Sequence, residues 1–276
     1  MGENGRKSVV ARTSTRYLDR IGRRATAPLR YEPKFLIIGG IRCGTTSLIR
    51  YLGQHPCVRI PATKEVHYFD WNFHRGRNWY RSWFPLDLER GNSDVIAGES
   101  SPAYLMDPHV PERVAETMPD ARIILLVRDP VERAHSHFRL RRSRGFEPRE
   151  SFSEALADEP RRMKAAMAPG KRSGVLLDSY FHQGEYVVGL ERWLAHFDQD
   201  QILIIQSERF FADPAASHGE VLEFLDLAPH DVGQYDVHNA APAANIDPDL
   251  RSILSRRYGE ANARFYEMIG QDFGWT

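Results

Sequence analysis

Short apolar runs alternate with segments of helical spacing along most of the chain. Four runs are almost wholly apolar and are bounded by polar residues or glycine: 34–39, 94–99, 121–127 and 201–206. Runs of this length indicate strands that are buried on both faces of a parallel sheet. Apolar residues recur at helical spacing in residues 45–53, 108–118, 185–197 and 218–227. The alternation predicts an α/β fold in three layers, with a central parallel sheet flanked by helices.

The ends of several elements have their own signals. Asp129 followed by Pro130 predicts a helix start, with the aspartate as N-cap and the proline at the first helical position. Residues 248–269 form an amphipathic pattern that ends at Gly270. Two stretches break the alternation. Residues 141–178 predict a helical insertion with mobile ends, and residues 229–249 predict a long surface loop that is either a binding loop or simply flexible.

The composition is that of a soluble globular protein. The chain has 276 residues, of which 42% are hydrophobic and 27% are charged, and its formal net charge is zero. Bulk charge therefore gives no reason to expect a nucleic-acid partner. We expect no transmembrane segment, because no apolar run approaches the roughly 20 residues that a membrane helix needs. Two cysteines, Cys43 and Cys57, cannot form a disulfide framework, which favours the reducing cytoplasm.

Residues 1–30 are polar and strongly basic, with eight lysine or arginine residues against two acidic ones. We expect a partly disordered, flexible leader here; weak contact with an anionic membrane surface or polymer is the alternative. Residues 31–276 then form a single domain, which a chain of this length suits.

A glycine-rich loop joins the first predicted strand to the first predicted helix. In residues 39–47, three glycines allow close approach of an anion, and Thr45, Thr46 and Ser47 add hydroxyl donors at a helix start. The spacing matches an ATP-type phosphate loop, but Thr45 stands where that loop has its lysine. A cation occurs earlier in the loop instead, at Arg42. This pattern favours a donor with one 5′-phosphate that bears a transferable group and needs no metal.

A second anion site is predicted after the strongest strand. Arg128 follows the carboxyl end of that strand, where ligands bind in open parallel sheets, and Ser136 lies eight residues further on. Together they would hold a second phosphate. The alternative is a helix cap with an exposed arginine. Paired with the first loop, this site indicates a 3′,5′-bisphosphate nucleotide.

The chain resembles the family of sulfotransferases that use 3′-phosphoadenosine 5′-phosphosulfate (PAPS). The resemblance is to the carbohydrate branch, which includes heparan sulfate sulfotransferases, and to a soluble, bacterial-type member of it. Five segments carry it in the family's order: 39–47, 64–71, 99–104, 128–136 and 272–275. The resemblance implies a single sulfotransferase domain with a P-loop-like fold. It also implies PAPS as co-substrate, released as 3′,5′-ADP, and no metal.

The resemblance also implies roles for particular residues. The 5′-phosphosulfate would be bound by Arg42, Cys43, Gly44, Thr45, Thr46 and Ser47, and the 3′-phosphate by Arg128 and Ser136. Glu65 would be the base that deprotonates the acceptor, provided that partial burial raises its pKa toward neutrality. His67 is the rival base, and packing beside Tyr68 and Phe69 is its alternative role. Arg42 would assist catalysis by stabilising the sulfuryl group.

Three positions depart from the family pattern. Arg42 stands where the family usually has lysine; it keeps the charge but is a poorer proton donor. Ser100 stands where heparan-type enzymes carry a lysine. The Lys-Gly-Arg loop expected in the last third is absent, and residues 238–242 occupy roughly that region. The contact with adenosine is therefore expected to differ.

The acceptor is predicted to be a hydroxyl, or an amine, of a carbohydrate, a glycolipid or another small molecule. An aromatic stretch after the base segment would stack on sugars or else pack in the core: Trp71, Phe73, His74, Trp79, Tyr80 and Trp83. A basic run would contact an anionic polysaccharide or else form a solvated helix face: Arg139, Arg141, Arg142 and Arg144. Two rival functions are a P-loop kinase or NTPase and a non-catalytic nucleotide-binding module. The oligomeric state has no signal in the sequence.

Overall fold

The computed structural model describes most of the chain, in four stretches: residues 22–88, 94–166, 179–236 and 245–275. Three predicted features lie wholly or partly outside these residues: the leader up to residue 21, the end of the helical insertion at 167–178, and the stretch 238–242. Within the described residues, no helix is both long enough and apolar enough to cross a membrane.

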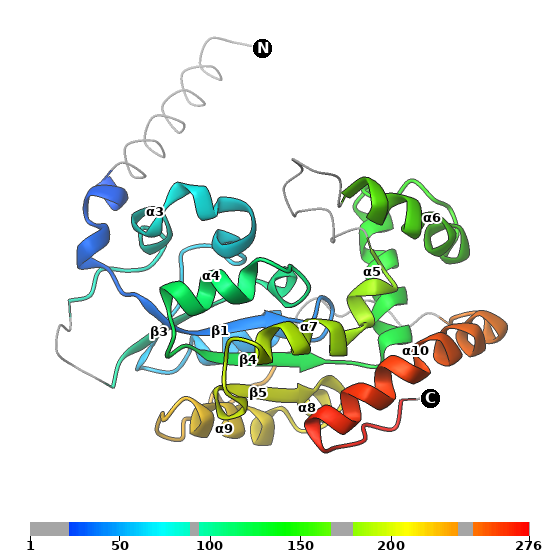
Figure 1. Cartoon of the computed structure of the whole chain (residues 1–276). Helices are drawn as coiled ribbons and strands as arrows, with labels where there is room; N and C mark the ends of the chain where they lie inside the picture. Colours follow the sequence, from blue (N-terminus) through cyan, green and yellow to red (C-terminus); the bar gives the residue numbers. More distant parts are fainter. Residues whose placement is uncertain (1–21, 89–93, 167–178, 237–244, 276) are drawn as a thin grey trace, which may run out of the picture.

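A five-stranded sheet forms the centre of the molecule, in the order β2-β3-β1-β4-β5 (Figure 1). The strands are β1 (Pro33–Gly39), β2 (Val58–Arg59), β3 (Ile96–Ser100), β4 (Arg122–Val127) and β5 (Ile202–Gln206). Every pair of neighbours is parallel. The four apolar runs of the sequence are thus four of the five strands, and the predicted parallel sheet is confirmed. The two-residue strand β2 was not predicted.

Nine α-helices are described: α2 (Thr45–Leu52), α3 (Arg77–Arg81), α4 (Val110–Thr117), α5 (Pro130–Ser143), α6 (Phe152–Ala166), α7 (Tyr186–Leu194), α8 (Ser207–Ala212), α9 (Pro214–Phe224) and α10 (Pro248–Ile269). The helix expected at 218–227 begins earlier, because Asp213 caps it by accepting a hydrogen bond from the N–H of Ala216. The short helix α8 was not predicted. Helix α10 ends at Gly270, which has a left-handed conformation, as expected.

Alternate residues of each strand pack against different helices. In β1, Leu36 and Ile38 face a core shared with α4, α7 and α10, whereas Phe35 and Ile37 face a core shared with α2, α8 and α9. Burial of one such side chain contributes about 1.5–3 kcal/mol. Because both faces are buried, the strands show no alternation of polar and apolar residues. The three-layer α/β prediction is therefore confirmed.

Strand β1 has β3 on one side and β4 on the other. The chain leaves β1 toward β2 and β3, and then returns to the far side of β1 to form β4. This reversal creates a topological switch point at the carboxyl ends of β1 and β4. Ligands bind at such a point in open α/β sheets. The phosphate loop follows β1 and Arg128 follows β4, so both predicted anion sites lie there.

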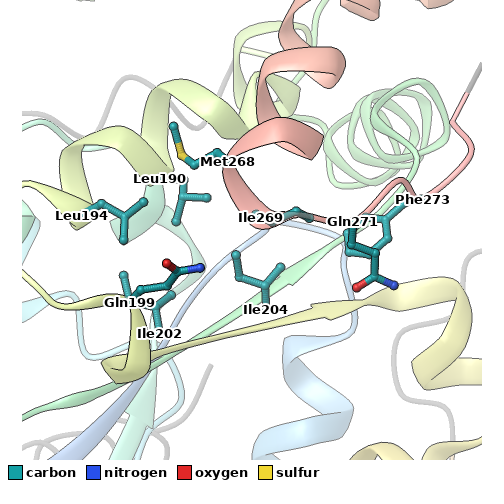
Figure 2. Close-up of a pocket in the computed structure, with 9 residues that line it drawn as sticks. All are labelled: Leu190, Leu194, Gln199, Ile202, Ile204, Met268, Ile269, Gln271 and Phe273. Carbon is teal, nitrogen blue, oxygen red and sulfur yellow. The ribbon is translucent and has the colours of Figure 1, made fainter.

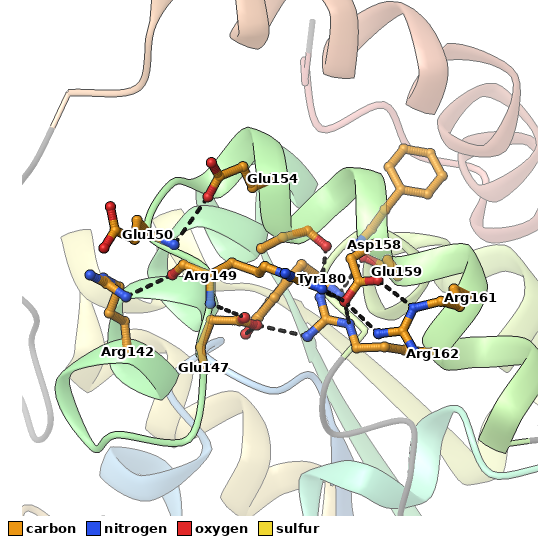
Figure 3. Close-up of polar contacts among 12 residues, drawn as sticks. Arg142, Glu147, Arg149, Glu150, Glu154, Asp158, Glu159, Arg161, Arg162 and Tyr180 are labelled. Carbon is orange, nitrogen blue, oxygen red and sulfur yellow. Dashed lines mark hydrogen bonds and ion pairs between the residues drawn. The ribbon is translucent and has the colours of Figure 1, made fainter.

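Helices α5 and α6 extend to one side of the sheet (Figure 1). Charged contacts fix α6 in place (Figure 3). The buried carboxylate of Glu147 accepts hydrogen bonds from the Tyr180 hydroxyl at 2.6 Å and from Arg162 at 2.7 Å. Asp158 pairs with Arg149 at 3.0 Å. The predicted insertion therefore consists of the end of α5, a connection at residues 144–151 and an anchored helix α6, and its residues 167–178 lie outside the described residues.

A cavity of about 220 Å³ lies between α7, β5 and the end of α10 (Figure 2). Leu190, Ile204 and Met268 are among the residues that line it, and none of the lining residues is charged. It lies near the amino end of β5, whereas the phosphate loop lies at the carboxyl end of the parallel strand β1. This cavity is therefore separate from the predicted anion sites.

Residues 22–30 lie against the body of the protein. A 3₁₀ helix spans Ala27–Leu29, and the buried guanidinium of Arg30 donates a hydrogen bond to the carbonyl of Phe84 at 2.7 Å. Arg30 also forms an isolated β-bridge with Leu86. The division of the chain into a leader and a domain at residue 31 stays a prediction.

Candidate active site

The phosphate loop passes from β1 to α2 through two residues with positive φ. Arg42 has a φ of 72° and Gly44, the N-cap of α2, has a φ of 97°. Gly44 tolerates this conformation without strain because it lacks a Cβ. The first N–H groups of any α-helix have no partner within the helix, and the helix dipole favours negative charge beside them. The start of α2 is therefore an anion-binding position.

The loop's side chains divide between the core and the open side of the site. Cys43 is fully buried; its Sγ lies 3.7 Å from the Tyr186 hydroxyl, and its N–H bonds to the carbonyl of Gly40. Burial raises the pKa of the Cys43 thiol. Ser47 is also fully buried, whereas Thr46 is half-buried. The binding role implied for Cys43 stays a prediction, and its side chain lies beneath the loop.

Arg42 connects the two predicted anion sites. Its Nε donates a hydrogen bond to the Ser136 hydroxyl on α5 at 3.0 Å. Burial lowers the pKa of Arg42, and the positive charges of Arg128 and Arg144 lower it further. The guanidinium groups of Arg128 and Arg144 thus lie close enough to repel that of Arg42, which is partly buried. Such a concentration of positive charge suits a ligand with several negative charges.

At the second predicted anion site the helix-cap alternative is confirmed, and phosphate binding by Arg128 and Ser136 stays a prediction. Asp129 caps α5, since its carboxylate accepts hydrogen bonds from the N–H groups of Val131 and Glu132. Arg128 precedes the cap, and its side chain is partly exposed beside Glu132 at 3.7 Å. The segment is therefore a true helix cap that also presents an arginine next to the phosphate loop.

Tyr186 joins the two loops, and sequence reasoning missed it. Its hydroxyl donates to the carbonyl of Arg128 at 2.8 Å, accepts from the N–H of Arg128 at 3.2 Å, and contacts Cys43. Trp275 packs against the Tyr186 ring, with ring centroids 5.7 Å apart. The closing motif of the chain therefore supports the centre of the site. The resemblance had marked the segment 272–275, but nothing in the sequence marked Tyr186 itself.

The base segment has an unusual backbone. Glu65 has a φ of 59° and His67 a φ of 52°, and a π-helix follows at Tyr68–Asn72. Both features are uncommon for residues with side chains and occur preferentially at functional sites. The two left-handed residues aim the Glu65 and His67 side chains at each other, with His67 Nε2 3.6 Å from Glu65 Oε2.

His67 lies between two carboxylates. Its Nδ1 is 2.7 Å from Oδ2 of Asp70, and its ring stacks on Trp71 with centroids 3.8 Å apart. Burial alone would lower the pKa of His67, but the hydrogen bonds and charges of Asp70 and Glu65 outweigh burial and raise the pKa to about 9. His67 is therefore a cation at neutral pH, and it orients Glu65 more readily than it accepts a proton. Asp70 was not singled out in the sequence.

The condition placed on Glu65 is wrong. Partial burial was expected to raise its pKa toward neutrality. Burial does act in that direction, but the hydrogen bond from His67 and the charge of Lys64 outweigh it and lower the pKa of Glu65 to about 2. Glu65 is therefore ionised and ready to accept a proton at any physiological pH, although it is a weak base in this state.

Lys64 links the base segment to the phosphate loop. Its Nζ donates hydrogen bonds to Thr46 Oγ1 at 2.5 Å and to Glu65 Oε1 at 2.9 Å. Thr46 lies in the first turn of α2, so the predicted base is one side chain away from the anion-binding helix start. The sequence placed Lys64 in the family segment but assigned it no role.

Glu99 holds the base segment on the sheet. Its fully buried carboxylate accepts hydrogen bonds from the hydroxyls of Tyr80, Ser101 and Tyr104 and from the N–H of Val66. Burial raises the pKa of Glu99, and these hydrogen bonds oppose the rise. Neighbouring Ser100 is also buried, and no partner of its hydroxyl is found within the described residues. The end of β3 thus holds the segment that carries the predicted base, Glu65.

Most of the aromatic stretch packs in the core. Trp79 and Tyr80 are buried, and Tyr80 stacks on Tyr68 with centroids 4.4 Å apart. The core-packing alternative is therefore confirmed for these two. Trp71 differs, since it is half-buried and lies on His67 beside the base. Within the basic run, Arg142 and Arg144 are exposed, whereas Arg141 is half-buried and lies over the ring of Phe146. No cluster of three or more potential metal ligands occurs among the described residues.

These features define an α/β protein in which a glycine-rich loop, several arginines and a carboxylate gather at one edge of a parallel sheet. The family model described as "Sulfotransferase domain" matches residues 32–239. The chain therefore belongs to the sulfotransferase family, and the resemblance seen in the motifs is confirmed.

Three similar proteins place the chain within the family. It is 30% identical to heparan sulfate glucosamine 3-O-sulfotransferase 3B1 of Homo sapiens, over 88% of this chain and 65% of the relative. It is 36% identical to bifunctional heparan sulfate N-deacetylase/N-sulfotransferase 3 of Homo sapiens, over 72% of this chain and 23% of the relative. The chain thus spans less than two-thirds of either length. A crystal structure of a sulfotransferase from Alicyclobacillus acidocaldarius superposes with a TM-score of 0.74 at 29% identity, over 88% of this chain and 97% of that one.

Proposed function

We propose that the protein transfers a sulfuryl group from PAPS to a hydroxyl, or an amine, of a carbohydrate acceptor. The observation that carries the proposal is the contact of Arg42 with Ser136, which joins the two predicted anion sites, together with the carboxylate of Glu65, which Lys64 links to Thr46. A 3′,5′-bisphosphate donor needs two such sites, and an acceptor hydroxyl needs the base. The named activities of the two human relatives, both of which act on heparan sulfate, support a carbohydrate acceptor.

The side chains of the site suit the donor. Arg42 and the start of α2 would hold the 5′-phosphosulfate, and Arg128 with Ser136 would hold the 3′-phosphate. The positive charges of Arg128 and Arg144 act on Arg42, and with burial they lower its pKa, which supports the placement of an anion beside it. The donor carries an activated sulfuryl group on its 5′-phosphate. This phosphate is the leaving group, and positive charge beside it stabilises the negative charge that it gains. No metal enters this scheme, because guanidinium and N–H groups supply the positive charge.

Glu65 is the proposed base in a direct, in-line transfer. It accepts the proton of the acceptor group while the acceptor atom forms its bond to sulfur. The bond from sulfur to the bridging oxygen breaks, and its electron pair stays on the 5′-phosphate of the departing 3′,5′-ADP. His67, charged and held by Asp70, positions Glu65 for this step. Most of the catalysis is then positioning and electrostatics, and one well-placed donor supplies about 2.7–4 kcal/mol.

The same features support proposals for the acceptor and for the location of the protein in the cell. We propose a glycan or a glycolipid, with Trp71 as the aromatic surface nearest the base. Arg142 and Arg144 would contact an anionic polysaccharide from the exposed side of α5. The cytoplasm is the proposed location, since Cys43 and Cys57 are both free thiols.

Calorimetric titration tests the donor site directly. Tight binding of 3′,5′-ADP without metal, and weak binding of ATP with Mg²⁺, is the expected result. Preference for ATP with Mg²⁺ would replace the proposal with a P-loop kinase or NTPase.

Transfer of label from PAPS to polysaccharides and glycolipids tests the reaction. The Glu65→Gln variant should lose about 10²–10⁴-fold in rate, the usual contribution of a general base. The exposed Glu260→Gln variant on α10 is the matched control and should keep full activity. Binding of 3′,5′-ADP with no transfer by the wild type to any acceptor would identify a non-catalytic nucleotide-binding module instead.

A further inference from the structure

Lys64 occupies the space between the proposed base and the phosphate-binding helix start. Its ammonium group donates to the Thr46 hydroxyl at 2.5 Å and to the Glu65 carboxylate at 2.9 Å. The side chain is 35% exposed, so the ammonium lies at the open side of the site rather than in the core. It is therefore accessible to a ligand that reaches Thr46 from solvent.

Arg42 lies on the other side of the loop. Its Nε bonds to Ser136 on α5, and the positive charges that lower its pKa, after burial, are those of Arg128 and Arg144. Arg42, in the loop, thus faces the second predicted anion site. Lys64, from a different segment, is the cation that faces the proposed base.

Electrostatics requires a cation at this place. Glu65 is ionised, because His67 and Lys64 hold its pKa at about 2 against the effect of burial. The sulfuryl group of the donor is also anionic, and one acceptor atom must contact both groups at once. The Glu65 carboxylate and the sulfuryl group are then only one acceptor atom apart. Two negative charges this close repel each other strongly in a partly desolvated site. A positive charge between them removes the repulsion.

We propose that Lys64 is a sulfuryl-binding residue of the active site. The inference rests on the proposed function and deepens it. The ammonium exchanges its bond with Thr46 for hydrogen bonds to non-bridging sulfuryl oxygens, and it remains paired with Glu65. No proton leaves Lys64: Glu65 takes the acceptor proton, sulfur gains the acceptor atom, and the bridging oxygen leaves with the electron pair. Lys64 thus binds the sulfuryl group, whereas Arg42 lies between the 5′-phosphate and the proposed 3′-phosphate site.

The test compares two ligands that differ only by the sulfuryl group. Dissociation constants of PAPS and of 3′,5′-ADP are measured by calorimetry for the wild type and for Lys64→Met, Lys64→Arg and Lys164→Met. Lys164 is an exposed lysine on α6 and provides the matched control. In Lys64→Met, PAPS affinity should fall about 10–100-fold, the usual effect of losing a charge-assisted hydrogen bond. Affinity for 3′,5′-ADP should change less than about threefold, since the loop and Arg128 bind both phosphates. Lys64→Arg should restore most of the difference.

The outcomes separate this inference from the proposed function. A wild type that binds neither ligand contradicts the sulfotransferase proposal itself. A wild type that binds both, with Lys64→Met equally weakened for both or for neither, overturns only the role of Lys64. A purely structural lysine would produce that equal change, because the sulfuryl group would then be irrelevant. Retained 3′,5′-ADP binding by Lys64→Met also shows that the variant is folded.

Discussion

Replacement of Asp70 by asparagine should lower the pKa of His67, because it removes the negative charge beside the protonated ring. The Asp70 side chain is 1% exposed, and its Oδ2 lies 2.7 Å from His67 Nδ1. Its other oxygen accepts a hydrogen bond from the N–H of Trp71, which the asparagine oxygen can still accept. The substitution therefore removes the negative charge and leaves the local backbone contact. Burial is then opposed only by Glu65, and the pKa of His67 should fall.

The size of the effect follows from the pKa of His67. The change from 6.5 to about 9 in the folded protein corresponds to about 3 kcal/mol, at about 1.4 kcal/mol for each pKa unit. After burial, which lowers the pKa, the hydrogen bond to Asp70 is the largest cause and raises it. We assign about 2 kcal/mol to Asp70, which places the His67 pKa of the variant near 7.5.

The sign of the pH dependence distinguishes this charge effect from lost packing. A raised folded pKa stabilises the protein fully below pH 6.5, and this stabilisation is lost as the pH rises through about 9. Asp70→Asn should therefore lower the free energy of unfolding by about 2 kcal/mol at pH 6 and by much less at pH 10. Glu65 stays ionised throughout this range, because its pKa is about 2.

Urea unfolding at pH 6 and pH 10, with NMR titration of the His67 ring, measures both quantities. The control is Asp226→Asn, which removes an exposed carboxylate that pairs with Arg122. That variant should change the free energy of unfolding by less than about 1 kcal/mol. An equal loss for Asp70→Asn at both pH values, or a ring that still titrates near 9 in that variant, would refute the reasoning.

Two further substitutions test the supports of the site. Tyr186→Phe removes the hydroxyl that bonds to both backbone groups of Arg128. It should lower the free energy of unfolding in urea by about 1–2 kcal/mol. It should also weaken 3′,5′-ADP binding in calorimetry. Unchanged binding would mean that the hydroxyl does not position the second predicted anion site. Glu99→Ala leaves four buried donors without an acceptor and should cost at least about 3 kcal/mol. A cost below that of Arg209→Ala, which removes an exposed ion pair with Glu220, would contradict the support role of Glu99.

The sheet and the phosphate loop were predictable because their signals are local. Burial on both faces makes a strand apolar throughout, and four of the five strands show this pattern. The loop needs glycine at Gly44, where φ is positive, and a helix start directly after it. Asp129 and Pro130 likewise specify a helix start by their own chemistry. The same Asp-Pro signal at Asp213 was available for α9 and would have corrected the predicted start of that helix.

The relation between the base and the loop was not predictable in this way. Lys64 meets Thr46 across 18 positions of sequence, and Tyr186 meets Arg128 across 58. Such contacts depend on how the strands are ordered in the sheet, and that order leaves no trace in the local pattern.

The ionisation of Glu65 was mispredicted for a different reason. The cations that outweigh burial, Lys64 and His67, are close to Glu65 in the sequence. Their contact with the carboxylate accompanies a left-handed backbone at Glu65 and His67, which the local pattern does not predict.

The strand order explains why the three parts of the site meet. The parallel register aligns β1 with β3 and β4, with Ile37 opposite Ser100 and Gly39 opposite Leu125. The three strands therefore end at the same edge of the sheet. The end of β1 supplies the phosphate loop, the end of β4 supplies the second anion site, and the end of β3 holds the base segment through Glu99. A single edge thus brings together the two predicted anion sites of the proposed donor and the carboxylate that is the proposed base. The proposed transfer requires this combination, and none of the three segments provides it alone.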